Sequence, residues 1–293
     1  MSKRLIGRSR AATLLTAMLL TTPAEANRFR DNPERVVDRA RETWTSPIGE
    51  LERDVVSKMK DGLPDVVSTV GSAFLVSPCY IMTAAHVVYG DELSPLIDKD
   101  YTLQFRAGTS ATSAFAGKTT ATPVISGNRD IAHRNDWALM KLNNCVGQRP
   151  ELGWLEPSKK RLRLSSGKEV ITLGFEALQE RGALSAAQGR VLQAHLEDDL
   201  FKTDATFLPG QSGGPVLSIE DGTLVVSGMN VAELGLLQGK TYDHYTPDHA
   251  NLIIDVTRIL AKPYIKAILD DDKAAFGQPN PAAERLRMDH LPQ

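Results

Sequence analysis

The sequence predicts an all-β protein with two β-rich subdomains, framed by a helical extension before them and a helix after them. From Pro64 onward, short runs rich in β-branched residues alternate with Gly, Pro, Asn and Asp, and few helical patterns interrupt them. The polar stretch 146–168, with two prolines and several glycines, divides these runs into two groups. The expected strands are 66–70, 73–76, 80–82, 102–106, 137–142, 170–175, 190–195, 215–219 and 224–227.

The two ends of the chain differ from this central part. Residues 27–63 are highly charged, with apolar residues at helical spacing from Val36 to Met59, which predicts one or two short amphipathic helices in a structural extension or a propeptide. Helical spacing returns over 252–269, interrupted at Pro263, and predicts a closing helix. The charged, proline-containing segment 270–293 is expected to be a flexible tail.

The first 26 residues have the organisation of a secretory signal peptide. Four basic residues precede the apolar run 11–20, and Ala24-Glu25-Ala26 supplies a small-x-small cleavage site. The run is well short of the roughly 20 apolar residues that span a membrane, so no stable membrane anchor is expected and the mature protein should be secreted or periplasmic. Cleavage removes four bases and one acid and moves the formal net charge from −2 to −5, which does not suggest a nucleic-acid partner.

The chain has two cysteines, Cys79 and Cys145. Export to an oxidising compartment makes one disulfide between them the favoured hypothesis, and the alternative is two separate buried thiols. No CxxC spacing and no further cysteine are present, so no zinc site is predicted.

Three short motifs follow one another in the order His, Asp, Ser. They are Thr83-Ala84-Ala85-His86, the run Asp136–Leu142, and Gly210-Gln211-Ser212-Gly213-Gly214-Pro215. A serine hydroxyl is a weak nucleophile at neutral pH, so a base must take its proton as it attacks a carbonyl carbon. A histidine is suited to that task, and a carboxylate keeps its imidazole in the required tautomer.

These motifs resemble the three signature segments of the chymotrypsin/trypsin-like serine peptidases, in that family's chain order. The resemblance implies two six-stranded antiparallel β-barrels, barrel one over about 64–147 and barrel two over about 168–250, in a peptidase domain of residues 64–269. It also implies a secreted serine endopeptidase that hydrolyses a polypeptide substrate through an acyl-enzyme, without a cofactor. The catalytic residues would be His86, Asp136 and Ser212, and the oxyanion hole would be the backbone N–H groups of Gly210 and Ser212.

Two alternative assignments compete with this one. Asp130-Ile131-Ala132 imitates the start of the Asp motif, but Asp136 is preferred because a continuous, mostly apolar run follows it. The Ser motif also matches the nucleophile elbow of α/β-hydrolases, yet Pro215 opposes the helix that an elbow needs directly after the serine.

The remaining histidines are given structural roles. The elbow reading would leave only Asp243-His244 or Asp248-His249 as acid and base, and both pairs lie in a polar loop. Metal ligation by these pairs is a weak alternative. His133 and His195 have structural roles by default.

Several residues separate the chain from the digestive trypsins. Gln211 replaces the aspartate that in those enzymes pairs with a new N-terminus after zymogen cleavage. The sequence looks more like the bacterial glutamyl-endopeptidase-like and HtrA-type branches. No segment for a PDZ domain is expected. The resemblance assigns Thr206 to the base of the specificity pocket and Val226, Ser227 and Gly228 to its wall. No charged residue marks this pocket, which favours small or apolar substrate side chains. A catalytically idle binding protein of the same fold and an esterase with the same triad are the rival functions, and the oligomeric state is not predicted.

Overall fold

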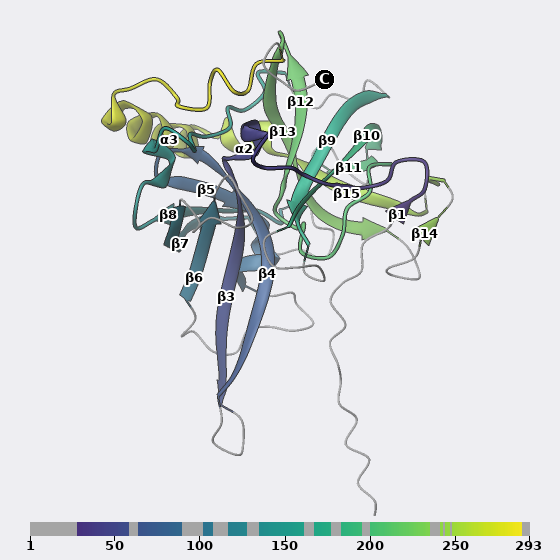
Figure 1. Cartoon of the computed structure of the whole chain (residues 1–293), viewed down its shortest axis with the longest axis horizontal. Coiled ribbons are helices and arrows are strands. Elements are labelled where there is room, and N and C mark those ends of the chain that lie inside the picture. The colour runs from purple at the N-terminus through teal and green to yellow at the C-terminus, as the bar shows by residue number, and fades with distance from the viewer. Residues whose placement is uncertain are drawn as a thin grey trace, which may run out of the picture.

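The computed structural model describes residues 28–58, 64–89, 102–107, 117–127, 135–160, 167–176, 183–194, 200–234, 241–242, 244–246 and 248–288. The predicted signal peptide, Asp130, His133, His195 and Asp243 lie outside these ranges. Two β-barrels pack against each other (Figure 1), and the fold class expected from the sequence is confirmed.

Barrel one is a closed sheet of six antiparallel strands in the order β3-β4-β5-β8-β7-β6. The interior is filled by large apolar side chains that are fully buried, among them Ile48, Phe74 and Phe105. The strands are β3 (Ile48–Lys58), β4 (Pro64–Ser77), β5 (Tyr80–Thr83), β6 (Thr102–Ala107), β7 (Gly117–Ser126) and β8 (Ala138–Leu142).

Barrel two is also closed by six strands, because β10 pairs with β11 in addition to the order β11-β15-β13-β12-β9-β10. The turn between β12 and β13 is formed by Asp221 and Gly222, which both have positive φ, as tight hairpins of this kind require. The strands are β9 (Lys168–Phe175), β10 (Leu184–Ala194), β11 (Leu200–Thr203), β12 (Pro215–Glu220), β13 (Thr223–Leu234) and β15 (Ala250–Asp255).

The segment before barrel one differs from its predicted helices. Its described part has one short 3₁₀ helix, η1 (Thr43–Thr45), while Ile48–Lys58 forms strand β3 and closes barrel one between β4 and β6. The helical expectation for 48–58 is therefore wrong, because pairing with two strands distant in sequence overrides the local apolar spacing. Barrel one begins at Ile48 rather than Pro64.

Upstream of η1 the chain lies along barrel two. Strand β2 (Arg35–Val36) pairs with β10, and β1 (Arg28–Phe29) pairs in parallel with β14 (Thr241–Tyr242). Arg39 then joins the barrels: its guanidinium donates to the carbonyl oxygen of Ile48 at 2.9 Å and lies 5.2 Å from the ring centre of Phe175 on β9. Burial lowers the pKa of Arg39 to about 10, and the charge of Glu50 opposes that shift.

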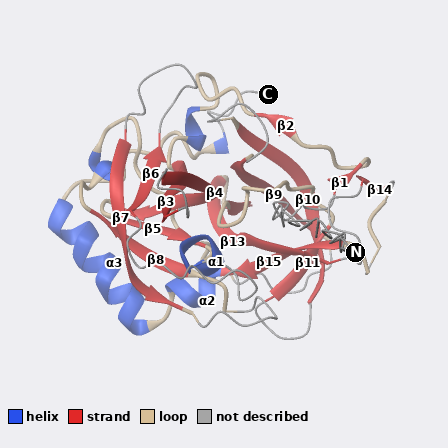
Figure 2. Cartoon of the chain, turned by 90° about the horizontal axis from the view of Figure 1, so that it is seen from below, coloured by secondary structure: helices blue, strands red, loops and turns tan. Residues whose placement is uncertain are grey.

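After barrel two the chain returns to barrel one. Residues 250–255, partly expected as helix, form β15, and the closing helix is split into α2 (Val256–Leu260) and α3 (Pro263–Phe276). Helix α3 lies along the barrel-one side of the molecule (Figure 2), in line with the hydrogen bonds of its Asp272 to Ser77 and Cys79. Among the described residues no helix is long and apolar enough to cross a membrane.

The tail expected to be flexible is ordered as far as residue 288. Helix α3 extends to Phe276, and beyond it Ala282 and Leu286 are buried in the core while Arg287 pairs with Thr223. The charged, proline-containing composition of this segment did not reveal these two apolar anchors.

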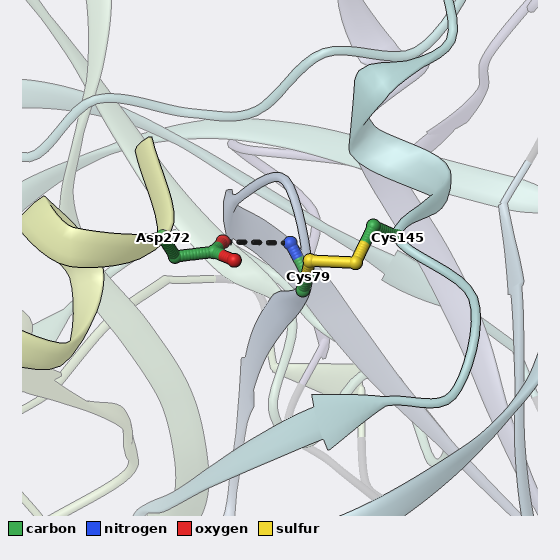
Figure 3. A group of neighbouring side chains, drawn as sticks. All are labelled: Cys79, Cys145 and Asp272. Atoms are coloured by element: carbon green, nitrogen blue, oxygen red, sulfur yellow. Dashed lines mark hydrogen bonds between the residues drawn. A yellow bond between two sulfur atoms is a disulfide. The ribbon is translucent and has the colours of Figure 1, made fainter. Parts of the chain in front are cut away.

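Cys79 and Cys145 form a disulfide, as the sequence predicted (Figure 3). The bond joins the β4–β5 turn to the short helix η2 (Val146–Gln148), and the carboxylate of Asp272 accepts the backbone N–H of Cys79 at 2.9 Å. Asp272 also accepts the hydroxyl of Ser77 at 2.6 Å. The disulfide and the contact of α3 with barrel one therefore both involve the β4–β5 turn.

Replacement of both cysteines by serine should lower the free energy of unfolding. The cysteines are 66 residues apart, and closing a loop of that length in the unfolded chain corresponds to a stabilisation of about 4 kcal/mol. Denaturant unfolding of the wild type, of the double variant and of the reduced wild type measures this loss, and the last two should agree. Alkylation of both thiols in the unfolded, unreduced wild type would contradict the disulfide.

Candidate active site

His86 and Asp136 are brought together by the pairing of β5 with β8. The register aligns Thr83, the last residue of β5, with Ala138, the first of β8. His86 follows β5 on the short helix α1 (Ala85–Tyr89), and Asp136 lies two residues before the start of β8. Neighbouring strands lie about 5 Å apart, so residues just beyond paired ends must approach each other.

The two oxygens of Asp136 both accept hydrogen bonds from His86. The backbone N–H of His86 donates to Oδ1 at 2.9 Å, and the imidazole Nδ1 lies 2.5 Å from Oδ2. The carboxylate is buried, whereas the imidazole keeps 27% of its side-chain surface exposed. With Nδ1 held by the carboxylate, Nε2 is the ring nitrogen left to exchange a proton with another group.

Ser212 lies in a tight turn between β11 and β12. Within the turn, the N–H of Gln211 donates to Leu208 at 3.0 Å and the N–H of Gly214 donates to Gln211 at 2.9 Å. Gly210 and Gly213 on either side of Ser212 have φ of 92° and 82°. These bonds and glycine conformations present Ser212 half-buried at the surface of the turn.

The turn of residues 208–214 holds the candidate nucleophile Ser212 and is called the nucleophile turn. It packs closely against barrel one. The carbonyl oxygen of Ser212 accepts the N–H of Ser72 at 2.8 Å. A Cβ at Gly213 would collide with the carbonyl oxygen of Ser72, with Oγ1 of Thr83 and with the backbone nitrogen of Ala84. Since Ala84 is two residues before His86, the motifs containing Ser212 and His86 meet where the two barrels join.

Two backbone donors are open in the same turn. Within the described part of the chain, the N–H groups of Gly210 and Ser212 donate no hydrogen bond, while those of Gln211, Gly213 and Gly214 all do. A pair of N–H groups directed at a developing negative charge is the arrangement that stabilises a tetrahedral oxyanion.

The residues predicted to line a specificity pocket are bonded to other parts of barrel two and to the segment between the barrels. Thr206 is buried, and its carbonyl oxygen accepts the hydroxyl of Thr172 at 3.2 Å. The backbone of Val226 is paired with the segment between the barrels, through Glu156 at 2.9 Å and Ser158 at 2.8 Å. The hydroxyl of Ser227 is bonded to that of Ser218 at 2.5 Å inside barrel two, and Gly228 pairs with Val216. Val226 and Ser227 therefore face other partners than the nucleophile turn.

The residue of β13 that contacts the nucleophile turn is Asn230, which the sequence analysis missed. Its backbone oxygen accepts the N–H of Gly213 at 2.8 Å and its backbone N–H donates to Gly214 at 2.9 Å. Its buried amide donates to the carbonyl oxygens of Leu173 at 3.1 Å and Gln211 at 3.4 Å. Counting a hairpin outward from the Asp-Gly turn at 221–222 pairs residue 214 with residue 229, one position short of Asn230. A register shift between Val216 and Leu217 accounts for the difference.

The described histidines of the polar loop contact other residues than the neighbouring aspartates. Nδ1 of the exposed His244 lies 3.2 Å from Asp31, and Nδ1 of the half-buried His249 lies 3.1 Å from the hydroxyl of Thr246. Cys79, Cys145 and Asp272 are close enough together to suggest a metal site, but both sulfurs are joined in the disulfide and offer no thiolate to an ion (Figure 3).

Comparison with known proteins identifies a family and a solved structure of similar fold. The family model described as a trypsin-like peptidase domain matches residues 71–226, more than half of the chain. A solved structure of a Glu endopeptidase in complex with MPD is similar in fold, with a TM-score of 0.57 and 17% sequence identity over 84% of this chain and 99% of that one. Curated protein sequences give no significant match.

Gly213→Ala should destabilise the protein more than Gly222→Ala. Both glycines have positive φ, 82° and 77°, so both alanines incur about 1–2 kcal/mol of backbone strain. A Cβ at Gly222 meets nothing within 4 Å, whereas one at Gly213 collides with barrel one, which adds about 1–3 kcal/mol. Denaturant unfolding measures both losses. Equal losses would show that the turn does not pack against barrel one as described.

Proposed function

This chain belongs to the family of trypsin-like peptidase domains, and from that premise we propose that it is an exported serine endopeptidase with a catalytic triad of Ser212, His86 and Asp136. The observation that carries the proposal is the double hydrogen bond from His86 to Asp136 next to the turn that holds Ser212. Because the family, the fold and the residue chemistry agree, a peptidase reaction is favoured over an idle binding role.

The proposed reaction begins with attack of Ser212 Oγ on the carbonyl carbon of the scissile peptide bond. The hydroxyl proton passes to Nε2 of His86, and the carbonyl oxygen becomes an oxyanion. When the tetrahedral intermediate collapses, the carbon–nitrogen bond breaks and the same proton goes to the leaving amine. Water then attacks the acyl-enzyme ester by the same route and releases the carboxylic acid and free Ser212.

Asp136 stabilises the charged form of His86 during both transfers. Its buried carboxylate is 2.5 Å from Nδ1, so the positive charge that arises on the imidazole is balanced at short range and away from water. Its second hydrogen bond, from the backbone N–H of His86, fixes the orientation of the carboxylate relative to the ring. The N–H groups of Gly210 and Ser212 take the role of the oxyanion hole.

The preferred side chain before the scissile bond is proposed to be small or apolar. The residues assigned to the pocket, which are Thr206, Val226, Ser227 and Gly228, carry no charge that would attract a charged side chain. The structurally similar protein is a Glu endopeptidase, but at 17% identity its specificity does not transfer by likeness alone. A predominance of cleavage after Glu, or after Lys and Arg, would contradict this preference.

Export is proposed from the signal-like residues 1–26 together with the disulfide. Disulfides are characteristic of secreted and periplasmic proteins, because cytosolic reductants keep thiols reduced. A polypeptide is the proposed substrate, and the chemistry of the triad requires neither a metal ion nor a cofactor.

A fluorophosphonate probe should label the wild-type protein at Ser212, and a peptide library should be cleaved by it. Both signals should vanish in Ser212→Ala, because the nucleophilic oxygen is removed. Mass spectrometry locates the label, and sequencing of the cleaved peptides gives the preferred side chains. Ser218→Ala, a serine inside barrel two, is the control and should label as the wild type does. Label at another serine, or none on folded wild type, would contradict the mechanism.

The value of kcat/KM should fall about tenfold per pH unit on acidification below the range in which histidines protonate, about pH 6–7. A protonated Nε2 has no lone pair with which to accept the proton of Ser212, so the loss follows the fraction of neutral His86. Initial rates measured between pH 5 and 8 test this, with circular dichroism at each pH to show that the fold persists. A flat profile down to pH 5 would remove His86 from the role of base.

A further inference from the structure

Ser72 connects the nucleophile turn of barrel two to barrel one by both its backbone and its side chain. It lies on β4 and is fully buried. Its N–H donates to the carbonyl oxygen of Ser212 and its hydroxyl donates to the carbonyl oxygen of Gly210, both at 2.8 Å. These are the two residues whose own N–H groups form the proposed oxyanion hole.

The hydroxyl of Ser72 has its donor and acceptor roles assigned by its neighbours. It accepts the backbone N–H of Phe175 on β9 at 2.8 Å, so its single proton is directed to the carbonyl oxygen of Gly210. The carbonyl oxygen of Ser72 in turn accepts the hydroxyl of Thr83 at 2.7 Å, in the motif that leads to His86. Ser72 thus bonds to the nucleophile turn, to the end of β9 in barrel two and to the segment that precedes His86.

Gly210 is the part of the turn that most needs such a restraint. With φ of 92° and no side chain, it has wide conformational freedom, and rotation of its backbone would redirect its N–H. The bond from Ser72 to the carbonyl oxygen of Gly210 holds the peptide plane between Gly210 and Gln211 against barrel one. It thereby removes one of the two backbone rotations of Gly210 that can redirect its N–H. Ser212 is held separately, through the backbone N–H of Ser72, so a change of the Ser72 side chain removes the bonds to Gly210 and Phe175 but leaves the bond to Ser212.

We propose that Ser72 is a positioning residue of the active site, whose hydroxyl orients Gly210 so that its N–H faces the oxyanion of the transition state. The inference rests on the proposed function and adds a residue outside the triad and the oxyanion hole. Charge develops on the carbonyl oxygen mainly in the transition state, so loss of this orientation lowers kcat and leaves KM nearly unchanged. Small displacements in such sites reduce rates by up to about a hundredfold, and a loss of about 10- to 100-fold is expected for Ser72→Ala.

The test compares Ser72→Ala with Ser77→Ala and with Ser72→Thr. Ser77 is a buried serine on the same strand whose hydroxyl is bonded to Asp272, away from the nucleophile turn, so it controls for loss of a buried hydroxyl. Threonine keeps the hydroxyl and should restore most of kcat. The measurements are kcat and KM on a peptide cleaved by the wild type, the rate of fluorophosphonate labelling at Ser212, and the melting temperature of each variant. Ser72→Cys, which keeps the volume with a weaker donor, replaces Ser72→Ala if the alanine variant does not fold.

The expected result for Ser72→Ala is a lower kcat and slower labelling, with KM within about threefold of the wild type. Ser77→Ala should have near wild-type kinetics, although its melting temperature falls by a similar amount. If Ser72→Ala and Ser77→Ala have the same kcat in an active background, Ser72 has no positioning role and the inference is overturned. If KM rises while kcat is retained, the hydroxyl acts on substrate binding instead, which also overturns it. A folded wild type that neither labels nor cleaves would instead refute the proposed function itself, so the two failures are distinguishable.

Discussion

The close approach of the nucleophile turn to barrel one is the constraint on which the rest of this structure depends. At Gly213 the backbone passes so near to Ser72, Thr83 and Ala84 that a single Cβ has no space. In the proposed triad the base and its carboxylate belong to barrel one and the nucleophile to barrel two, so neither barrel holds all three residues. The relative position of His86 and Ser212 is set by this contact and by the hydrogen bonds of Ser72 across it. A reaction that depends on proton transfer over a hydrogen-bond distance requires such a fixed boundary.

The closure of both barrels fixes the positions of the loops that carry His86, Asp136 and Ser212. A strand in a closed sheet has both neighbours paired, so its ends cannot shift in register without breaking two ladders. The pairing of Thr83 with Ala138 therefore determines where His86 and Asp136 meet, and the pairing of Pro215 with Met229 determines where the nucleophile turn meets Asn230. The N-terminal segment connects the two barrels through Arg39, which contacts Ile48 and Phe175. Helix α3, which follows barrel two, is bound to barrel one by the hydrogen bonds of Asp272 with Ser77 and Cys79.

The sequence predicted the parts of this structure that have a local signal. Turn residues and β-rich runs gave the fold class, three short motifs gave the candidate triad, and cysteine count gave the disulfide. Strand β3 was missed because its apolar residues happen to recur at helical spacing, while its partners β4 and β6 decide its conformation. The contact of Ser72 with Gly210 joins residues 138 positions apart, so no local sequence pattern predicts it. The contact of Asn230 with the nucleophile turn was likewise not predicted, because a register shift between Val216 and Leu217 in the β12–β13 hairpin decides which residue of β13 faces the turn.

The position of β3 also limits how this enzyme could be switched on. A propeptide that extended to residue 63 would include β3, and its removal would open barrel one between β4 and β6. Cleavage before Ile48 would leave that barrel closed but would remove Arg39 and β2, which connect the segment to Phe175 and to β10. Gln211 carries no charge to pair with a new N-terminal amine, and its N–H and carbonyl oxygen are already bonded within the turn. The turn is thus held by its own hydrogen bonds and by contacts with barrel one and β13, while the N-terminal segment is bound to both barrels. Loss of the signal-like residues alone is therefore the processing step that removes none of these contacts.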